Sequence, residues 1–419
     1  MAAAQQLSHV YPLGSRINER GHLEVGGCDT AELAREFGTP CYVVAEDDIR
    51  SRARAFVQAF AARGEDFEVV FASKAFPCTA VLRVLWEEGI GADVASGGEL
   101  TLALAAGVDP RRIHLHGNAK TRDEIEMALR AGVGDVIADN MRDLDLLEDF
   151  VPAGSTQRVF LRIAPGVSPE THPAISTGGP NTKFGFDIAH APAAIERAQA
   201  SSAVELEGLH MHIGSQIMEL APYRAALERL SGLGDFAAYN LGGGLGVAYN
   251  AHDEAPSIED YVAAKLDAVS DVLGQNKKVI DEPGRALVAN ACVTLYEVQS
   301  VKRNVDVYVA VDGGMSDNLR PMLYGARYEA QIATRPGGGE RCHVVGKHCE
   351  SGDVLVRDAD LDQPRAGDIL VTPATGAYGH AMANTYNGAL RPPVVFASGG
   401  DARVVVRRET YEDLAARDV

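Results

Sequence analysis

Lys74 is the first residue of the chain whose type and position could do chemistry. It stands in FASKAF, where it follows the apolar run FEVVFA. A lysine among apolar neighbours has a lowered pKa and can form a Schiff base with a carbonyl compound. The alternative is a lysine that lays its stem along the surface and keeps its ammonium group in water. Both interpretations stay open for this residue taken alone.

A second group of reactive side chains lies in LHMHIGSQ. His210 and His212 are two residues apart, so both lie on one face of a predicted strand. Two imidazoles on a barrel strand are a common pair of metal ligands. The other interpretation is one core histidine and one functional histidine. Gly214 and Ser215 add a close backbone approach and a hydroxyl group, which suit a phosphate.

Two further segments carry groups that could bind an anionic cofactor. In NLGGGLG, the glycines at 242–244 let the backbone approach an anion and offer it N–H groups. In DEPGR, Glu282 either pairs with Arg285 or holds a protonated ring nitrogen while the arginine holds a phosphate or carboxylate group. Together with Lys74, these groups fit a pyridoxal phosphate site better than a metal or nicotinamide site.

The segment CHVVGKHCESGD places two cysteines and two histidines close together in sequence. A zinc site is one interpretation, but Cys342 and His343 would point to opposite faces of a strand, and the spacing to His348 and Cys349 fits no standard finger. We therefore expect no metal here. Cys349, followed by Glu350, is better interpreted as a reactive thiol in a turn that can carry a proton.

These residues need a scaffold, and the chain from 43 to 287 predicts one. Short apolar runs alternate there with amphipathic stretches such as RDEIEMALRAG, which indicates βαβ units and a parallel sheet. Eight units over roughly 240 residues have the size of a (β/α)8 TIM-like barrel, whose functional groups gather at the C-terminal ends of the strands. The predicted strands are 67–72, 92–95, 113–116, 135–139, 159–163, 208–212, 237–242 and 278–283.

The remainder of the chain predicts a second, smaller domain. After residue 288 the pattern changes to β-branched runs broken by glycine, proline and aspartate, which indicates an antiparallel β-barrel or sandwich over 288–419. The N-terminal segment 1–42 is too short to fold alone, and we expect it to pack with that domain. The expected fold class is therefore α/β, with a TIM-like barrel and a C-terminal β domain that takes in the N-terminal segment.

Composition excludes several classes of function. The chain has 419 residues, with 39 Lys and Arg against 58 Asp and Glu, a formal net charge of −19. Such a negative field disfavours phosphate backbones and anionic lipids, so we expect no nucleic-acid or membrane partner. No apolar run reaches the roughly 18 residues of a spanning helix, and the first residues lack the pattern of a signal peptide. We expect a cytoplasmic protein whose six cysteines are reduced.

Ten motifs, in order along nearly the whole chain, resemble those of the diaminopimelate decarboxylase family. They are FASKAF, GADVASGGEL, HGNAKT, STGGPNTKFG, GLHMHIGSQ, LGGGLG, EPGRA, VDGGMSDNLRPMLYGA, GKHCESGD and TGAYGHAMANTYN. Single motifs are shared with ornithine and arginine decarboxylases, but the combination is more specific. The resemblance implies an alanine-racemase-type fold, pyridoxal 5'-phosphate as cofactor, and decarboxylation of meso-2,6-diaminopimelate to L-lysine, the last step of lysine synthesis.

The resemblance also implies roles for individual residues. Lys74 would form the Schiff base with the cofactor, His212 would stack on its ring, Glu282 would pair with the pyridine nitrogen, and Cys349 would donate a proton. The residues expected to bind the cofactor are Lys74, His212, Ser215, Gly242, Gly243, Gly244, Glu282, Gly284, Arg285 and Tyr378. Those expected to bind the substrate, a small amino acid, are Arg285, Arg320, Tyr324, Glu350 and Tyr378. In relatives the cysteine-bearing loop reaches the partner subunit's site, which implies a homodimer.

The choice of substrate depends on the stretch around Tyr324. Ornithine decarboxylases place an acid directly after the matching tyrosine, whereas this chain has Gly325 there and carries Arg320 nearby. An arginine favours a substrate with a second carboxylate, such as meso-diaminopimelate. Asn240 departs from the aspartate that many relatives have before the glycines.

Rival functions share part of this pattern. A related decarboxylase of ornithine, arginine or carboxynorspermidine would have nearly all of the motifs. A metal-dependent barrel hydrolase could be built on His210 and His212. A catalytically silent carrier of pyridoxal phosphate is a third possibility, against which the β domain and its GKHCESGD motif argue.

Overall fold

The computed structural model describes residues 7–64, 66–167 and 182–419, and the chain divides into two compact units. The first unit comprises Met1–Ser51, Val247–Glu254 and Leu287–Val419, and the second comprises Arg52–Gly246 and Ala255–Ala286. The segment 247–254, which lies inside the range expected for the barrel, thus belongs to the first unit. Most of the STGGPNTKFG motif, at 176–185, lies outside the described residues.

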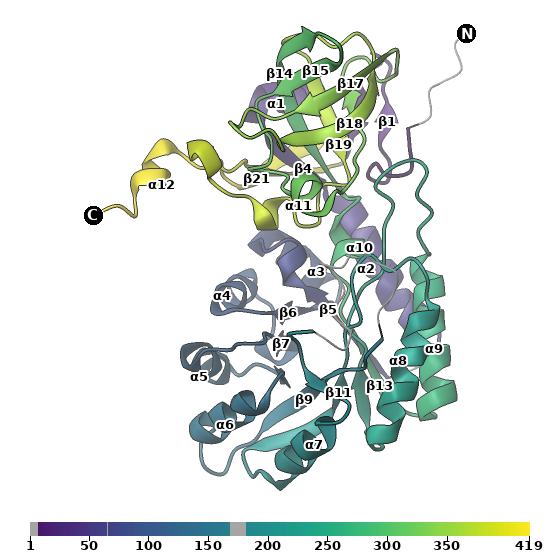
Figure 1. Ribbon diagram of the computed structural model, residues 1–419, viewed down its shortest axis with the longest axis vertical. Coiled ribbons are helices and arrows are strands. Elements are labelled where there is room, and N and C mark those ends of the chain that lie inside the picture. Colours follow the sequence, from purple (N-terminus) through teal and green to yellow (C-terminus); the bar gives the residue numbers. More distant parts are fainter. Residues whose placement is uncertain (1–6, 65, 168–181) are drawn as a thin grey trace. The chain divides into compact units, whose positions relative to one another are not determined.

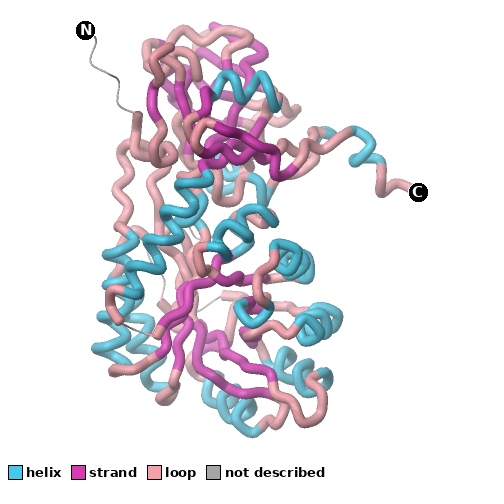
Figure 2. Tube along the Cα trace, turned by 180° about the vertical axis from the view of Figure 1, so that it is seen from behind, coloured by secondary structure: helices cyan, strands magenta, loops and turns pink. Residues whose placement is uncertain are grey.

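The second unit is a closed barrel of parallel strands with helices on its outside (Figures 1 and 2). The pairing order is β9-β11-β12-β13-β5-β6-β7-β8, and β8 pairs with β9 to close the ring. This confirms the predicted TIM-like barrel. The strands are β5 (Phe67–Ala72), β6 (Gly91–Val94), β7 (Ile113–Leu115), β8 (Asp135–Ala138), β9 (Gln157–Ala164), β11 (Val204–His210), β12 (Ala238–Asn240) and β13 (Lys278–Asp281), with the short β10 (Phe186–Asp187) added to β9.

Helices follow most of the barrel strands, and local sequence signals determine where a helix begins and ends. In α5 (Arg122–Ala131), Thr121 and Glu124 form a reciprocal capping box at the N-terminus, and Gly132 ends the helix in the left-handed conformation. None of the described helices is long and apolar enough to cross a membrane. The other helices of this unit are α3 (Thr79–Glu87), α4 (Gly97–Ala106), α6 (Met141–Phe150), α7 (Ala191–Ala200), α8 (Ala221–Leu230) and α9 (Ile258–Leu273); α2 (Glu46–Ala61) and α10 (Arg285–Val288) span the boundaries between the units.

Apolar side chains fill part of the barrel interior. One buried cluster consists of Val70, Ile137, Phe160, Ala238 and Ile280, which come from five different strands. Strands that are buried on both faces read as continuous apolar runs. The runs FEVVFA and DVIAD, which contain β5 and β8, therefore predict strands from the sequence alone.

The first unit contains a sheet in the order β18-β17-β15-β14-β4-β20-β21, in which β19 also pairs with β14 and β16. Most of its pairs are antiparallel, as predicted, but β15 pairs with β17, and β4 with β20, in parallel. The reason is that longer connections separate these partners in sequence. The strands are β14 (Cys292–Arg303), β15 (Val307–Val311), β16 (Gln331–Ile332), β17 (Glu340–Val345), β18 (Val354–Leu361), β19 (Ile369–Pro373), β20 (Val394–Ser398) and β21 (Asp401–Val406), and the helices are α11 (Arg320–Tyr324) and α12 (Tyr411–Ala415).

The N-terminal segment belongs to this β domain, as the sequence predicts. Strand β4 (Cys41–Ala45) lies between β14 and β20 in the sheet. A separate small sheet and one helix precede it, and their side chains join a core that includes Val293, Leu295 and Val395. These elements are β1 (Arg16–Ile17), β2 (Leu23–Val25), β3 (Cys28–Asp29) and α1 (Thr30–Phe37).

Candidate active site

Lys74 and Glu282 follow neighbouring strands at the C-terminal end of the barrel. Strand β13 pairs with β5, Lys74 lies in the 3-10 turn Ser73–Ala75 directly after β5, and Glu282 comes directly after β13. The Lys74 side chain is exposed, whereas Glu282 is buried. A Cβ atom at Gly284 would lie only 3.1 Å from the Cβ of Ala72, so a glycine there lets the two strand ends approach closely.

The Glu282 carboxylate is surrounded by three nitrogen groups. Asn240 Nδ2 donates a hydrogen bond to it at 2.6 Å, and the Nε2 atoms of His116 and His210 lie 2.9 and 3.2 Å from its oxygens. Burial by itself raises the pKa of a carboxyl group, but His116 and His210 hold the pKa of Glu282 well below its ordinary value. The site therefore keeps a charged carboxylate in a buried position.

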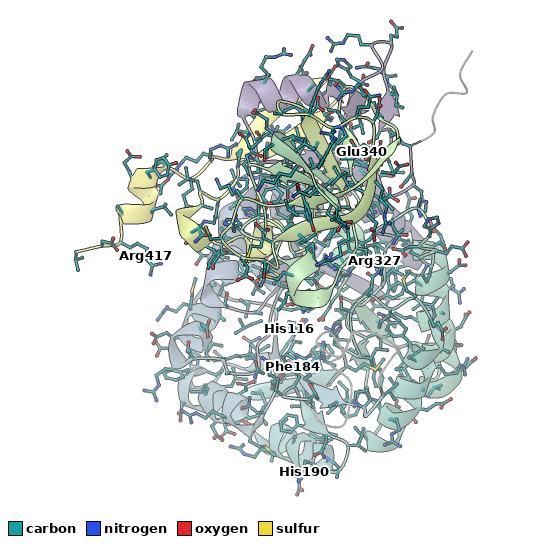
Figure 3. All side chains as sticks on the ribbon, turned by 45° about the horizontal axis from the view of Figure 1, so that its top comes forward. His116, Phe184, His190, Arg327, Glu340 and Arg417 are labelled. Carbon is teal, nitrogen blue, oxygen red and sulfur yellow. The ribbon has the colours of Figure 1, made fainter. Side chains whose placement is uncertain are left out.

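His116 was not among the residues singled out from the sequence. It directly follows β7, and its ring lies 5.1 Å from that of His210, centre to centre. Figure 3 labels His116 among the side chains. An oxygen of Asp93 lies 3.7 Å from His116 Nε2, and burial raises the pKa of Asp93 to about 6. A signal was present, because IHLH places a histidine just where a predicted barrel strand ends.

His210 and His212 make different contacts. Burial lowers the pKa of His210 to about 4, so its imidazole is neutral and directs Nε2 at Glu282. His212 lies beyond the end of β11, where its Nδ1 accepts the N–H of Gly243 at 3.2 Å. Burial and the positive charge of Lys74 lower the pKa of His212 well below its ordinary value. An accepting Nδ1 also requires a neutral ring.

The glycine loop at 242–244 uses two of its three amides internally. The N–H of Gly242 donates to Asn240 Oδ1 at 3.0 Å, and that of Gly243 donates to His212. Two of the three amides of this loop therefore already have acceptors within the protein. Within the described ranges, the amide of Gly244 donates to no other group. It is the donor of this loop that could serve a phosphate.

Ser215 and Arg285 come together beside this loop. Arg285 Nη2 donates to Ser215 Oγ at 2.9 Å. The amide of Ile217 donates to the carbonyl oxygen of Gly244 at 2.9 Å, which holds the Ser215 segment next to the glycines. A hydroxyl group, a guanidinium and a backbone amide thus gather at one place, which is a suitable set for an anionic group.

Three groups of this site lie near enough to one another to share a metal ion: the carboxylate of Glu282 and the imidazoles of His116 and His210. The metal interpretation of the sequence paired His210 with His212, and the structure instead places His116 beside His210. One oxygen of Glu282 already accepts the amide of Asn240 and faces His116. The Glu282 carboxylate thus already has partners within the protein, and the lysine that follows the neighbouring strand β5 is Lys74.

The remaining predicted residues lie in the first unit. Cys349 is exposed, and its amide donates to Asn387 Oδ1 at 3.0 Å, whereas the other five cysteines are buried. Glu350 accepts the amide of Gly352 at 3.2 Å. Cys342 is buried, and burial raises its pKa to about 11, whereas the exposed Cys349 is the cysteine that solvent reaches.

Arg320 and Tyr378 also show distinctive local structure. Arg320 is buried, donates a hydrogen bond to the hydroxyl group of Tyr328, and lies 4.4 Å above the ring of Tyr249. The two tyrosines hold its guanidinium in one orientation. Tyr324, at the end of α11, is half-buried. Tyr378 has a φ of 66°, a left-handed conformation that is rare outside glycine and concentrated at functional sites.

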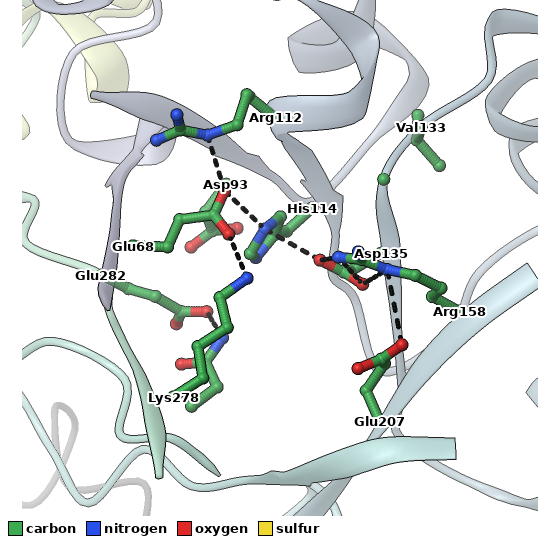
Figure 4. A network of polar contacts seen from close by, with 12 residues as sticks. Glu68, Asp93, Arg112, His114, Val133, Asp135, Arg158, Glu207, Lys278 and Glu282 are labelled. Carbon is green, nitrogen blue, oxygen red and sulfur yellow. Dashed lines mark hydrogen bonds and ion pairs between the residues drawn. The ribbon is translucent and has the colours of Figure 1, made fainter. Parts of the chain in front are cut away.

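A second buried polar cluster lies at the opposite, N-terminal end of the barrel strands (Figure 4). His114 Nε2 lies 3.5 Å from Glu68 and 3.1 Å from Asp135. Lys278 and Arg112 contact Glu68 at 3.0 and 2.7 Å, and a third cation, Arg158, contacts Asp135 at 2.7 Å. The carboxylates are therefore neutralised by side chains. This cluster stabilises the barrel rather than forming part of the candidate site.

Comparisons with known proteins show the family to which the chain is similar. Residues 46–289 match the family model of the pyridoxal-dependent decarboxylases, described as their pyridoxal binding domain. The chain is 46% and 44% identical to the diaminopimelate decarboxylases of Halalkalibacterium halodurans and Bacillus subtilis, over 97% of this chain and 97% of each relative. The crystal structure of diaminopimelate decarboxylase from M. jannaschii with L-lysine has a TM-score of 0.90 and 36% identity, over 97% of both chains.

Proposed function

This chain belongs to the diaminopimelate decarboxylase family of pyridoxal-dependent enzymes, and we propose that it decarboxylates meso-2,6-diaminopimelate to L-lysine and CO2. The observation that carries the proposal is the buried, charged Glu282 carboxylate, held by Asn240, His116 and His210 next to the strand that presents Lys74. An amine and a protected carboxylate on adjacent strand ends are what a pyridoxal enzyme requires.

The residues present fit pyridoxal 5'-phosphate. Lys74 supplies an exposed primary amine, and the neutral ring of His212 can lie flat against an aromatic system. The amide of Gly244, the hydroxyl group of Ser215 and the guanidinium of Arg285 provide donors of three kinds for a phosphate. When bound, the cofactor acts as an electron sink for the electron pair that loss of CO2 leaves on the α-carbon.

Side chains of the protein would hold or donate the protons that the decarboxylation requires. Glu282 would hold a proton on the ring nitrogen, and its low pKa keeps the carboxylate charged for this purpose. Cys349, the exposed thiol, would return a proton to the α-carbon after CO2 has left. Lys74 would hold the cofactor before the substrate arrives and reclaim it after the product leaves.

Substrate choice is proposed to depend on the first unit. Arg320, held by Tyr328 and Tyr249, would bind the carboxylate of the centre that does not react. Arg285, Tyr324 and Tyr378 would also bind the substrate. Glu350 would hold the ammonium group of the substrate or discriminate its stereocentre. A preset guanidinium favours a dicarboxylate over ornithine or arginine, which have no second carboxylate.

We further propose that the enzyme is a homodimer in the cytoplasm, in which the Cys349 loop of one subunit completes the site of the other. Mixing the inactive variants Lys74→Ala and Cys349→Ala tests the shared site. If subunits exchange and each site uses one Lys74 and one Cys349 from different chains, the mixture regains activity. Exchanged dimers that stay inactive would show that each subunit uses its own cysteine.

The substrate is tested by measuring CO2 release and product formation with added pyridoxal phosphate. The panel consists of meso-diaminopimelate, L-ornithine, L-lysine, L-arginine and carboxynorspermidine. Turnover confined to meso-diaminopimelate is the expected result, together with a yellow protein whose cofactor is fixed to Lys74 by borohydride. Turnover of another member would overturn the substrate, and a colourless protein with stoichiometric zinc would favour the barrel hydrolase instead.

A further inference from the structure

The carbonyl groups of the glycine loop are held from behind by two buried side chains. The hydroxyl group of Tyr223, on α8, donates to the carbonyl oxygen of Gly243 at 2.8 Å. The ammonium group of Lys265, on α9, donates to the carbonyl oxygen of Gly242 at 2.9 Å. Both side chains are fully buried, and hydrogen bonds shielded from water are electrostatically stronger than exposed ones.

The direction of each carbonyl group sets the direction of the next amide. A peptide unit is planar and trans, so a carbonyl oxygen and the N–H of the following residue point in opposite directions. Because Tyr223 holds the oxygen of Gly243, the N–H of Gly244 points away from Tyr223. The oxygen of Gly242 is held by Lys265 and also by the backbone amide of Glu282, which donates to it at 3.1 Å, so the N–H of Gly243 points away from both and reaches His212 Nδ1.

Lys265 is itself held in one place. Its three donors are matched by Gly242, by the hydroxyl group of Tyr261 at 2.5 Å and by the carboxylate of Asp281. The side chains of Lys265 and Asp281 are both 0% exposed, and their opposite charges let a cation remain in the core behind the loop. The rings of Tyr223 and Tyr261 lie 4.5 and 4.4 Å from the ammonium group and stabilise it further.

We propose that Tyr223 and Lys265 are positioning residues for the cofactor, which they orient through the glycine loop without touching it. Tyr223 directs the amide of Gly244 toward the phosphate, and Lys265, together with the Glu282 amide, directs the amide of Gly243 so that it fixes the ring of His212. The inference rests on the proposed function, because it assumes that the barrel binds pyridoxal phosphate. It adds to that function a second layer of residues, located on α8 and α9.

The test compares two ligands that differ only in the phosphate. Apoprotein is titrated with pyridoxal 5'-phosphate and with pyridoxal, for wild type and for Tyr223→Phe. We expect Tyr223→Phe to weaken binding of pyridoxal phosphate about three- to tenfold, the effect of one misdirected hydrogen bond. Binding of pyridoxal should stay within about twofold, since it makes no use of the Gly244 amide.

Lys265 needs a paired change, because removing it alone leaves Asp281 buried without its cation. The double variant Lys265→Met/Asp281→Asn removes both charges and keeps the volumes similar. We expect it to weaken both ligands, because His212 contacts the ring that they share, and to weaken pyridoxal phosphate more. Equal affinities of this variant and wild type for both ligands would overturn the role of Lys265.

A matched control separates positioning from general stability. Tyr239 is buried in the same barrel, and its hydroxyl group bonds to the carbonyl oxygen of Gly234 at 3.3 Å, outside the glycine loop. Tyr239→Phe should leave the ratio of the two affinities unchanged. Equal weakening of both ligands by Tyr223→Phe, or no weakening of either, would overturn the role of Tyr223. A wild-type protein that binds neither ligand would overturn the proposed function as well.

Discussion

The side-chain amide of Asn240 donates a hydrogen bond of 2.6 Å to the Glu282 carboxylate, while its oxygen accepts the amide of Gly242 at 3.0 Å. One residue thus joins the acid that would hold the cofactor's ring nitrogen to the loop expected to lie at its phosphate. An aspartate, which the resemblance to the family leads one to expect here, could accept from Gly242 but could not donate to Glu282 when ionised.

Asn240→Asp is therefore expected to raise the pKa of Glu282. A second carboxylate within hydrogen-bonding distance disfavours the charged form of the first. We expect the variant to remain active at neutral pH and the acidic limb of its kcat/KM profile to move to higher pH. The measurement is a pH profile of lysine formation for the two proteins, and superimposable acidic limbs would contradict the prediction.

Cys349→Ala should retain the cofactor but lose turnover. General acid catalysis contributes about 10²- to 10⁴-fold, so lysine formation should fall by roughly that factor. Borohydride fixation of the cofactor to Lys74 should be unaffected. Cys342→Ala is the matched control, because that thiol is buried and its pKa is raised to about 11, and it should turn over at nearly the wild-type rate.

Arg320→Gln should raise the KM for meso-diaminopimelate more than it lowers kcat. A hydrogen bond to a charged group is worth about 1.5–3 kcal/mol, which corresponds to a loss of roughly ten- to hundredfold in kcat/KM. Tyr328→Phe removes the hydroxyl group that orients the guanidinium and should cause a smaller rise in KM. A normal KM in both variants would remove Arg320 from substrate binding.

His114 makes the stability of the barrel depend on pH. Although burial lowers the pKa of a histidine, the carboxylates of Glu68 and Asp135 raise the pKa of His114 above its ordinary value of 6.5. The native state therefore keeps a proton that the unfolded state releases above pH 6.5, and the stabilisation is lost as the pH rises through the native pKa. One proton corresponds to a slope of at most about 1.4 kcal/mol per pH unit.

The variant His114→Gln should lack this contribution. Its free energy of unfolding, measured with urea, should differ from that of wild type most below pH 6.5 and least at alkaline pH. At the acidic end, both proteins should lose stability as Glu68, whose pKa is held well below its ordinary value, becomes protonated. A difference between the two proteins that is constant with pH would contradict the assignment.

Much of the fold could be predicted from the sequence because its signals are local. The barrel strands are continuous apolar runs, and helix α5 has its own capping box and terminal glycine. The parallel pairs β15–β17 and β4–β20 could not be predicted in the same way. Pairing direction depends on how the chain returns to the sheet, and a strand's own residues do not encode that path.

For the candidate site, too, the sequence and the tertiary structure determine different features. The sequence by itself determined which reactive groups stand at strand ends, among them Lys74, His212 and Glu282, since barrel geometry places every strand end at one rim. Tertiary structure alone decided their partners. Asn240 and His210 reach Glu282 from positions 42 and 72 residues away in sequence, and His212 accepts the amide of Gly243. Hydrogen bonds act over about 3 Å and depend on direction, so only the closed barrel settles which donor meets which acceptor.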